Sequence, residues 1–89
     1  MTRPAVRIAY CADCGYDGQA IDLARALLAE FGHDLSSISL IPWDDGTFDV
    51  SVDGEIVHSM AKNGGFPEHG AVTAKVRARV AAHAATEGR

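Results

Sequence analysis

Two cysteines, Cys11 and Cys14, are the residues of this chain best suited to covalent chemistry. They are the only cysteines, and they follow a short alternating apolar segment and precede a segment with helical periodicity. Thiols at this spacing, at a junction between strand and helix, are typical of dithiol–disulfide exchange. A Cys-x-x-Cys segment in the first turn of a helix also provides the Cα separation that a disulfide requires, about 4.4–6.8 Å. The pair therefore predicts a redox site.

The residues around the pair predict only a modest lowering of the thiol pKa. A helix start favours a thiolate because its first N–H groups lack partners and its dipole is positive there. Asp13 and Asp17 oppose this effect, since carboxylates repel a thiolate. At such junctions the first cysteine is usually the more exposed one, so we expect Cys11 to attack and Cys14 to resolve the mixed disulfide.

Two other interpretations of the pair are inert buried thiols and half of a metal site. Zinc normally takes four ligands. The other candidate ligands form no second close pair; they are His33, His58, His69 and His83. We therefore expect no structural zinc within the chain and assign no metal and no cofactor. Two thiolates remain suitable ligands for a soft ion such as Cu(I).

Length and charge restrict the class of protein. Eighty-nine residues predict a single domain over residues 1–89, with a frayed tail over residues 85–89. The net charge of −4 argues against nucleic acid as a partner. No apolar run approaches the roughly 20 residues that span a bilayer, and the first residues lack the apolar stretch of a signal peptide. We therefore expect a cytoplasmic protein without a membrane partner.

The elements around the cysteines follow from hydrophobic periodicity. Strand alternation begins at Val6, and a helical stripe over residues 15–31 ends at Gly32. Further strands are predicted over residues 36–41, 48–52 and 55–60. The connection over residues 42–46 contains Trp43, and Pro67 is predicted to open the last helix.

The hairpin at Asp53-Gly54 has two possible registers. A two-residue loop would pair Val52 with Glu55. A three-residue loop ending at Gly54 would pair Val50 with Ile56, which suits the apolar pattern better, so we favour the second register.

The predicted order is β-α-β-β-β-α, with the first two strands parallel because a helix connects them. Alternation in the first and third strands places both helices on one face of a four-stranded mixed sheet. The other face, or a sheet edge, is then available for self-association into a homo-oligomer.

Several of these segments together resemble the selenoprotein W/T/H-type family, also called Rdx proteins. The resemblance runs from about Val6 to Val80 and is carried by Tyr10–Cys14, by Gly46–Gly54, by Ile56–Ser59 and by Gly64–Pro67. The Gly-x-Phe-acid-Val hairpin followed by Gly-Gly-Phe-Pro is more specific than Cys-x-x-Cys alone. With cysteine at both positions, the chain resembles the selenium-free bacterial type.

The resemblance implies a thioredoxin-like α/β fold whose dithiol is the redox centre. Family members that contain selenocysteine carry it at the position of Cys14, which implies that the second sulfur can be the reactive one; the order of attack therefore stays open. The loop after the last strand comes near the dithiol in such a fold. Phe66 then forms either an apolar wall beside the sulfurs or a plug under the last helix. Gly65, Phe66, Pro67 and Trp43 are candidate partner-binding residues.

The leading hypothesis is a cytosolic thiol–disulfide oxidoreductase that forms a reversible Cys11–Cys14 disulfide with glutathione or protein thiols. One alternative is a redox-sensing interaction module without turnover. A Cu(I) carrier is less well supported, because such carriers have the ferredoxin-like order β-α-β-β-α-β, which this chain does not show.

Overall fold

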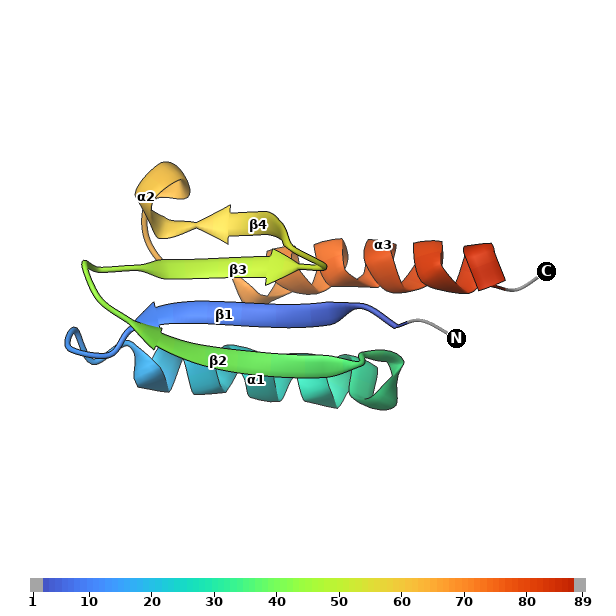
Figure 1. The fold of residues 1–89 in the computed structure, drawn as a ribbon, viewed down its shortest axis with the longest axis horizontal. Coiled ribbons are helices and arrows are strands. Elements are labelled where there is room, and N and C mark those ends of the chain that lie inside the picture. Colours follow the sequence, from blue (N-terminus) through green and yellow to red (C-terminus); the bar gives the residue numbers. More distant parts are fainter. Residues whose placement is uncertain (1–2, 88–89) are drawn as a thin grey trace.

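The chain folds around one sheet of four strands, seen here in a computed structural model that describes the backbone of residues 3–87 and the side chains of residues 3–84. Figure 1 shows the elements in order: β1 (Ala5–Cys11), α1 (Asp17–Phe31), a short 3-10 helix η1 (Gly32–Asp34), β2 (Ser37–Trp43), β3 (Phe48–Val52), β4 (Glu55–Ser59), α2 (Met60–Asn63) and α3 (His69–Glu87). The predicted order β-α-β-β-β-α is confirmed, with one extra helical turn before the last helix.

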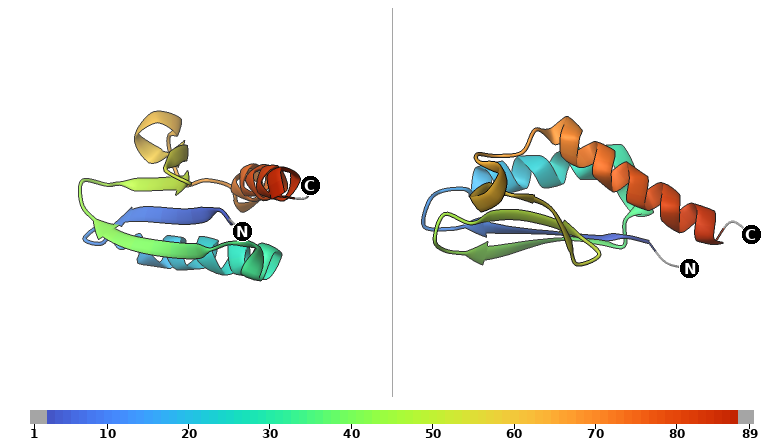
Figure 2. Two further views of the ribbon diagram at one scale, coloured as in Figure 1. Left: turned by 45° about the vertical axis from the view of Figure 1, so that its right-hand side comes forward. Right: turned by 90° about the horizontal axis from the view of Figure 1, so that it is seen from above.

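The sheet is mixed, with strand order β2-β1-β3-β4. β1 and β2 are parallel, whereas β1–β3 and β3–β4 are antiparallel. Both long helices lie on the same side of the sheet, as the view along its edge shows (Figure 2). This arrangement confirms the expected α/β fold with one covered and one uncovered face.

The core lies between the sheet and the two long helices and is formed by apolar side chains from both layers. Alternate residues of β1 and β3 point toward the helices and are almost fully buried. α1 contributes a stripe at helical spacing, and α3 contributes two valines. The buried apolar residues are Val6, Ile8, Ala20, Leu23, Ala24, Leu27, Phe31, Leu35, Phe48, Val50, Val52, Val72 and Val76. On the edge strand β2, Ile38 packs against this core, whereas Leu40 is 37% exposed.

The register favoured from the sequence for the hairpin is wrong. Val52 pairs with Glu55, so the loop has two residues, and an irregularity between Val50 and Ser51 absorbs one extra residue on β4. Asp53 and Gly54 both have positive φ, 54° and 86°. Such a pair is the geometry of the two-residue turn that matches strand twist. Beyond the irregularity Val50 pairs with His58 and Ser51 with Ile56, so the Val50–Ile56 pairing that had favoured the longer loop does not form.

Helix boundaries also differ from the expectation. α1 begins at Asp17 rather than Gly15, and α3 begins at His69 rather than Pro67. Part of the predicted loop after β4 is a single helical turn, α2, in which the Asn63 side chain accepts a hydrogen bond from the Ser59 N–H (2.9 Å). α3 continues to Glu87, and residues 88–89 of the predicted tail lie outside the described residues. Within the described part of the chain, no helix has the length and hydropathy needed to cross a bilayer.

Candidate active site

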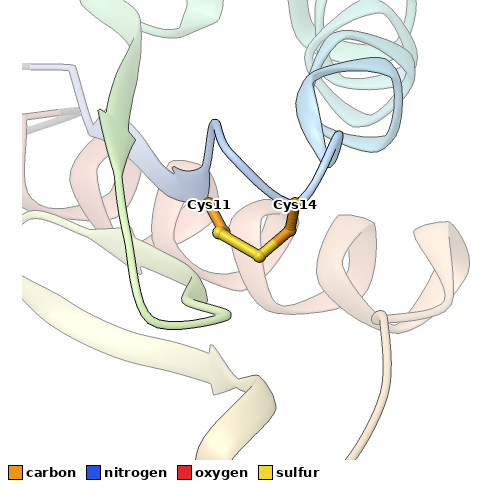
Figure 3. The surroundings of a disulfide bond; sticks show 2 residues. All are labelled: Cys11 and Cys14. Carbon is orange, nitrogen blue, oxygen red and sulfur yellow. A yellow bond between two sulfur atoms is a disulfide. The ribbon is translucent and has the colours of Figure 1, made fainter.

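Cys11 and Cys14 are joined by a disulfide at the carboxyl end of β1. Figure 3 shows Cys11 where the strand ends and Cys14 in the loop that leads to α1. Their Cα atoms are 5.3 Å apart, inside the range of about 4.4–6.8 Å that disulfides occupy. The predicted pair therefore lies at disulfide distance, at the junction between strand and helix.

The two sulfurs differ in accessibility. Cys11 is 1% exposed, whereas Cys14 is exposed. Cys11 is covered because it is still part of the sheet: its N–H donates to the Thr47 carbonyl (2.7 Å), and its strand neighbour in β2 is Trp43. The expectation that Cys11 is the more exposed cysteine is wrong. Cys14 is the cysteine that is open to solvent.

A tight turn places Cys14 outside the sheet. The Gly15 N–H donates to the Ala12 carbonyl (3.2 Å), and the Tyr16 N–H donates to the Cys11 carbonyl (3.2 Å). Gly15 has φ +77°, a conformation that other residues rarely adopt. Because α1 begins only at Asp17, Cys14 precedes the first helical turn rather than lying in it. The helix dipole, whose effect falls off within one turn, therefore acts on Cys14 more weakly than the sequence suggested.

Phe66 lies in an aromatic cluster beside the dithiol loop. Its ring centroid is 4.9 Å from that of Tyr16 and 5.1 Å from that of Phe48, both edge-on. Tyr16 follows Cys14 by two residues, and Phe48 begins β3. Phe66 is still 39% exposed. These contacts agree with a wall near the sulfurs better than with a plug under α3.

Tyr16 was missed by the sequence interpretation. It is half-buried and occupies the position before α1, where it links the dithiol loop to the loop that carries Phe66. The available signal was an aromatic side chain two positions after the second cysteine, at an otherwise polar helix start. The sequence alone shows no partner for that ring, because Phe66 lies 50 residues away.

The loop that carries Phe66 is held in a defined shape. Gly64 and Gly65 have φ values of 72° and 76°, so two consecutive residues need the left-handed region. The Gly64 N–H donates to the Met60 carbonyl (2.9 Å), and His58 Nε2 lies 3.0 Å from the Gly65 carbonyl, to which its N–H donates. Pro67 is half-buried. His58 is thus a residue that positions the loop.

Trp43 and four carboxylates complete this end of the molecule. Trp43 is the last residue of β2 and is 60% exposed, so it does not cap the core. The carboxylates are exposed, and we call them the acidic rim: Asp13, Asp17, Asp44 and Asp45. Among the described residues, none of them has an ion-pair partner within 4 Å. We call this region, the carboxyl ends of β1 and β2 with the start of β3, the dithiol end of the sheet.

The opposite end of the sheet carries paired charges. We call it the turn end, after the Asp53-Gly54 turn. One oxygen of the Asp53 carboxylate accepts the Ala5 N–H (3.0 Å), and the other lies 2.9 Å from His83 Nε2 and 3.6 Å from Arg79. The Ala5 hydrogen bond, with the neighbouring His83 and Arg79, lowers the pKa of Asp53 despite some desolvation. Arg79 also pairs with Glu55.

The described residues contain no group of three or more His, Cys, Asp or Glu side chains that could hold a metal ion. The four histidines lie in different places: His33 in η1, His58 in β4 and His69 and His83 in α3. What the dithiol end offers chemically is therefore one exposed sulfur, one buried sulfur and a surface of aromatic and acidic side chains.

Comparison with known proteins places this geometry in a family. Residues 5–78 match the model of the Rdx family. A solved protein from Bordetella parapertussis superposes with a TM-score of 0.84 at 32% identity, covering 86% of this chain and 98% of that one. A selenoprotein W-related protein from Vibrio cholerae superposes with a TM-score of 0.85 at 25% identity, covering 89% and 99%.

Among curated proteins, the chain is similar to migration and invasion enhancer 1 of Mus musculus (33% identity) and of Bos taurus (31% identity), each over 61 residues. The match covers 67% of this chain and 50% of each relative, so the chain spans about half the length of the curated relatives it matches. The family match extends over both cysteines, the hairpin and the loop that carries Phe66. The chain belongs to the Rdx family.

Proposed function

We propose that the protein is a thiol–disulfide oxidoreductase of the reducing cytosol, in which Cys14 attacks and Cys11 resolves. The observation that carries this proposal is the pair at disulfide distance with unequal access: Cys14 is exposed and Cys11 is 1% exposed. The chain belongs to the Rdx family, which is consistent with redox chemistry at this pair. The electron partner is glutathione or a protein thiol.

The exchange has two steps, which balance in atoms and electrons. In the reduced protein, the Cys14 thiolate attacks a substrate disulfide, forms a mixed disulfide and releases the first substrate sulfur as a thiolate. The Cys11 thiolate then attacks Cys14 Sγ, forms the intramolecular disulfide and releases the second substrate sulfur. Two electrons pass from the pair to the substrate, and the released thiolates take protons from water according to their pKa values. Reduction of the pair by two external thiols is the same sequence in reverse.

The fold supports this division of roles. The Cys11 N–H is held by Thr47 in the sheet, so the Cys11 sulfur stays in place while the Cys14 loop opens. The Cys14 loop lies outside the sheet and is closed by one turn that depends on Gly15. A fixed buried thiol next to an exposed one favours rapid resolution of a mixed disulfide, because the attacking group is already near the sulfur.

Single serine variants test the roles. With oxidised glutathione, Cys11→Ser should accumulate a stable glutathione adduct on Cys14, because the resolving thiol is absent. Cys14→Ser should react far more slowly, since its remaining thiol is buried. Mass spectrometry of alkylated protein measures both, and circular dichroism confirms that each variant is folded. Faster adduct formation by Cys14→Ser would reverse the assigned roles, and a wild-type pair that never forms a disulfide in any glutathione buffer would overturn the proposal.

A redox-sensing interaction module is the second candidate, and the exposure of Trp43 and Phe66 favours it, since these side chains suit a protein surface. The two functions differ in turnover. An oxidoreductase reduces many equivalents of a model disulfide when dithiothreitol is supplied. A module without turnover would bind its partner in one redox state and reduce no more than one equivalent.

A further inference from the structure

The dithiol end carries exposed carboxylates, which repel a negatively charged thiol of another molecule. The acidic rim comes from the two segments that meet at the dithiol: Asp13 precedes Cys14, Asp17 begins the helix after its loop, and Asp44 follows Trp43, whose carbonyl accepts the Ala12 N–H (3.0 Å). The turn that contains Asp44 touches the site, because its Thr47 carbonyl accepts the Cys11 N–H. These segments carry four exposed carboxylates that have no ion-pair partner among the described residues.

Few cations among the described residues lie near this rim. Lys62, in α2, is at the dithiol end, and it is exposed. The other described lysines and arginines lie along the sheet or toward its turn end: Arg3, Arg7, Arg25, Lys75, Arg77 and Arg79. Contacts hold several of them there: Arg3 donates to the His33 carbonyl, Lys75 to the Val57 carbonyl, and Arg79 pairs with Glu55. The local field at the dithiol end is therefore negative.

An aromatic side chain next to a carboxylate already binds an arginine elsewhere in this molecule. Arg77 lies 5.8 Å from the centre of the Phe31 ring and 2.6 Å from the Glu30 carboxylate. Like Glu30 and Phe31, Trp43 and Asp44 are adjacent in sequence; Trp43 is 60% exposed, and Asp44 has no ion-pair partner among the described residues. Tryptophan is the best aromatic partner for a guanidinium. The Trp43-Asp44 pair thus offers an unfilled place for an arginine of another molecule.

We propose that the physiological partner of this dithiol is a cysteine flanked by arginine or lysine in another protein, rather than glutathione. The inference rests on the proposed function and specifies its substrate. Glutathione carries a net negative charge at neutral pH because its carboxylates outnumber its ammonium group, so the acidic rim repels it. A second copy of this chain is disfavoured in the same way, since it has a net charge of −4 and the same rim.

Peptide thiols test the charge preference. The oxidised protein is mixed with one of two peptides of equal length, each with a single cysteine, flanked by arginines in one and by glutamates in the other, and with glutathione as a third thiol. Each rate of Cys11–Cys14 reduction is divided by the rate of the same thiol with 2-hydroxyethyl disulfide, which removes differences in intrinsic thiol reactivity. We expect a normalised preference of about tenfold for the arginine peptide at low salt. The preference should fall toward one at about 1 M salt, where the screening length is about 3 Å.

Two double variants that each remove two negative charges test whether the charge preference comes from the acidic rim. Asp44→Asn/Asp45→Asn should reduce the preference by about threefold, and asparagine tolerates the positive φ of Asp45 (60°). Asp22→Asn/Asp34→Asn makes the same change in net charge on exposed residues of α1 and η1 and should leave the preference unchanged. Trp43→Ala should slow the arginine peptide by about two- to fivefold and leave the glutamate peptide unaffected.

The outcomes separate this inference from the proposed function. If none of the thiols, including dithiothreitol, reduces the pair, the oxidoreductase function fails and the inference fails with it. If all three thiols react at equal normalised rates, or if glutathione is fastest, exchange is real and only the charge preference is overturned. A preference that persists at high salt, or that both double variants reduce equally, would also overturn the role of the acidic rim.

Discussion

The two ends of the sheet differ in whether their carboxylates have ion-pair partners among the described residues. At the turn end, carboxylates have partners within the chain: Asp53 accepts the Ala5 N–H and lies beside His83 and Arg79, and Glu55 pairs with Arg79. At the dithiol end, the carboxylates of the acidic rim have none among the described residues. Both ends are built from a loop between strands, so the difference lies in which segment packs beside them.

We infer that the charges at the turn end stabilise the fold, whereas those at the dithiol end serve recognition of a partner. α3 passes beside the turn end and supplies its cations, so charge there is satisfied internally and fixes the hairpin against the helix. In the part of the chain that the structure describes, Lys62 is the basic residue at the dithiol end, where four acidic residues and the aromatic Trp43 and Phe66 are exposed. Repulsion between like charges is tolerated on a surface that a partner of opposite charge can cover. Four sets of variants test whether the two ends differ in this way.

The largest effect is expected from Phe48→Ala. Phe48 is 1% exposed and lies in the core, whereas its neighbour Phe66 is 39% exposed. Loss of the buried ring should lower the free energy of unfolding by about 3–4 kcal/mol. Phe66→Ala should cost about 1 kcal/mol, because much of its ring is already in contact with water. Urea unfolding of both variants measures the pair; equal losses would place Phe66 in the core rather than on the partner-binding surface.

Gly15→Ala should lower the free energy of unfolding by about 1–2 kcal/mol. A side chain at this position is strained by φ +77°, although it would meet no atom within 4 Å. Gly18→Ala is the matched control: this glycine lies inside α1 without a positive φ and also has free space around it, so alanine should stabilise the helix by about 0.5–1 kcal/mol. Opposite signs in urea unfolding are the expected result. A stabilising Gly15→Ala would show that the turn does not require the left-handed conformation.

At the turn end, Asp53→Asn should lower stability by about 0.5 kcal/mol at neutral pH, with a smaller loss at high salt. Asparagine keeps the hairpin geometry and the acceptor for the Ala5 N–H but removes the charge. Because the folded-state pKa of Asp53 lies below the ordinary value of about 3.9, its ionised form stabilises the fold above that pH. This contribution is lost as the pH falls through the folded-state pKa. Unfolding of wild type and variant should therefore converge in acid, and a difference that grew in acid would contradict the pairing.

The smallest effect, and one of opposite sign, is expected from Asp44→Asn/Asp45→Asn at the dithiol end. Removing two adjacent exposed carboxylates without intramolecular partners should leave stability unchanged or raise it by about 0.2–0.5 kcal/mol at low salt. The measurement is urea unfolding at low and high salt beside Asp53→Asn. If both variants destabilised the protein equally, the two ends would not differ in how their charges are used.

The elements and the location of the dithiol could be predicted from the sequence because they depend on local patterns. Alternation around Val6 and Ile8, and the stripe that includes Leu23 and Leu27, indicate which face of each element is buried. The resemblance to a known family added the expectation of a thioredoxin-like fold with the dithiol as its redox centre. The predicted Cys11–Cys14 pair lies at disulfide distance in the structure.

The errors arose where non-local contacts outweigh local patterns. The hairpin register depends on a bulge near Val50, which no residue type in β4 marks. α1 begins at Asp17 because the residues before it close a turn back to Cys11 and Ala12 instead of a helical turn. α3 begins after Pro67 because the Gly64-Gly65 pair and the bond from His58 direct the chain around the dithiol end first.

The sequence by itself determined that two thiols follow a buried strand, that helices cover one face of the sheet, and that the chain is acidic. Periodicity and spacing are properties of neighbouring residues, so these features need no knowledge of the fold. Only the tertiary structure decided that Cys11 is the buried sulfur and Cys14 the accessible one, because Thr47 and Trp43 come from segments more than 30 residues away. The same holds for the contact of Phe66 with Tyr16 and for the gathering of the acidic rim: exposure and local charge depend on which distant segments pack beside a residue.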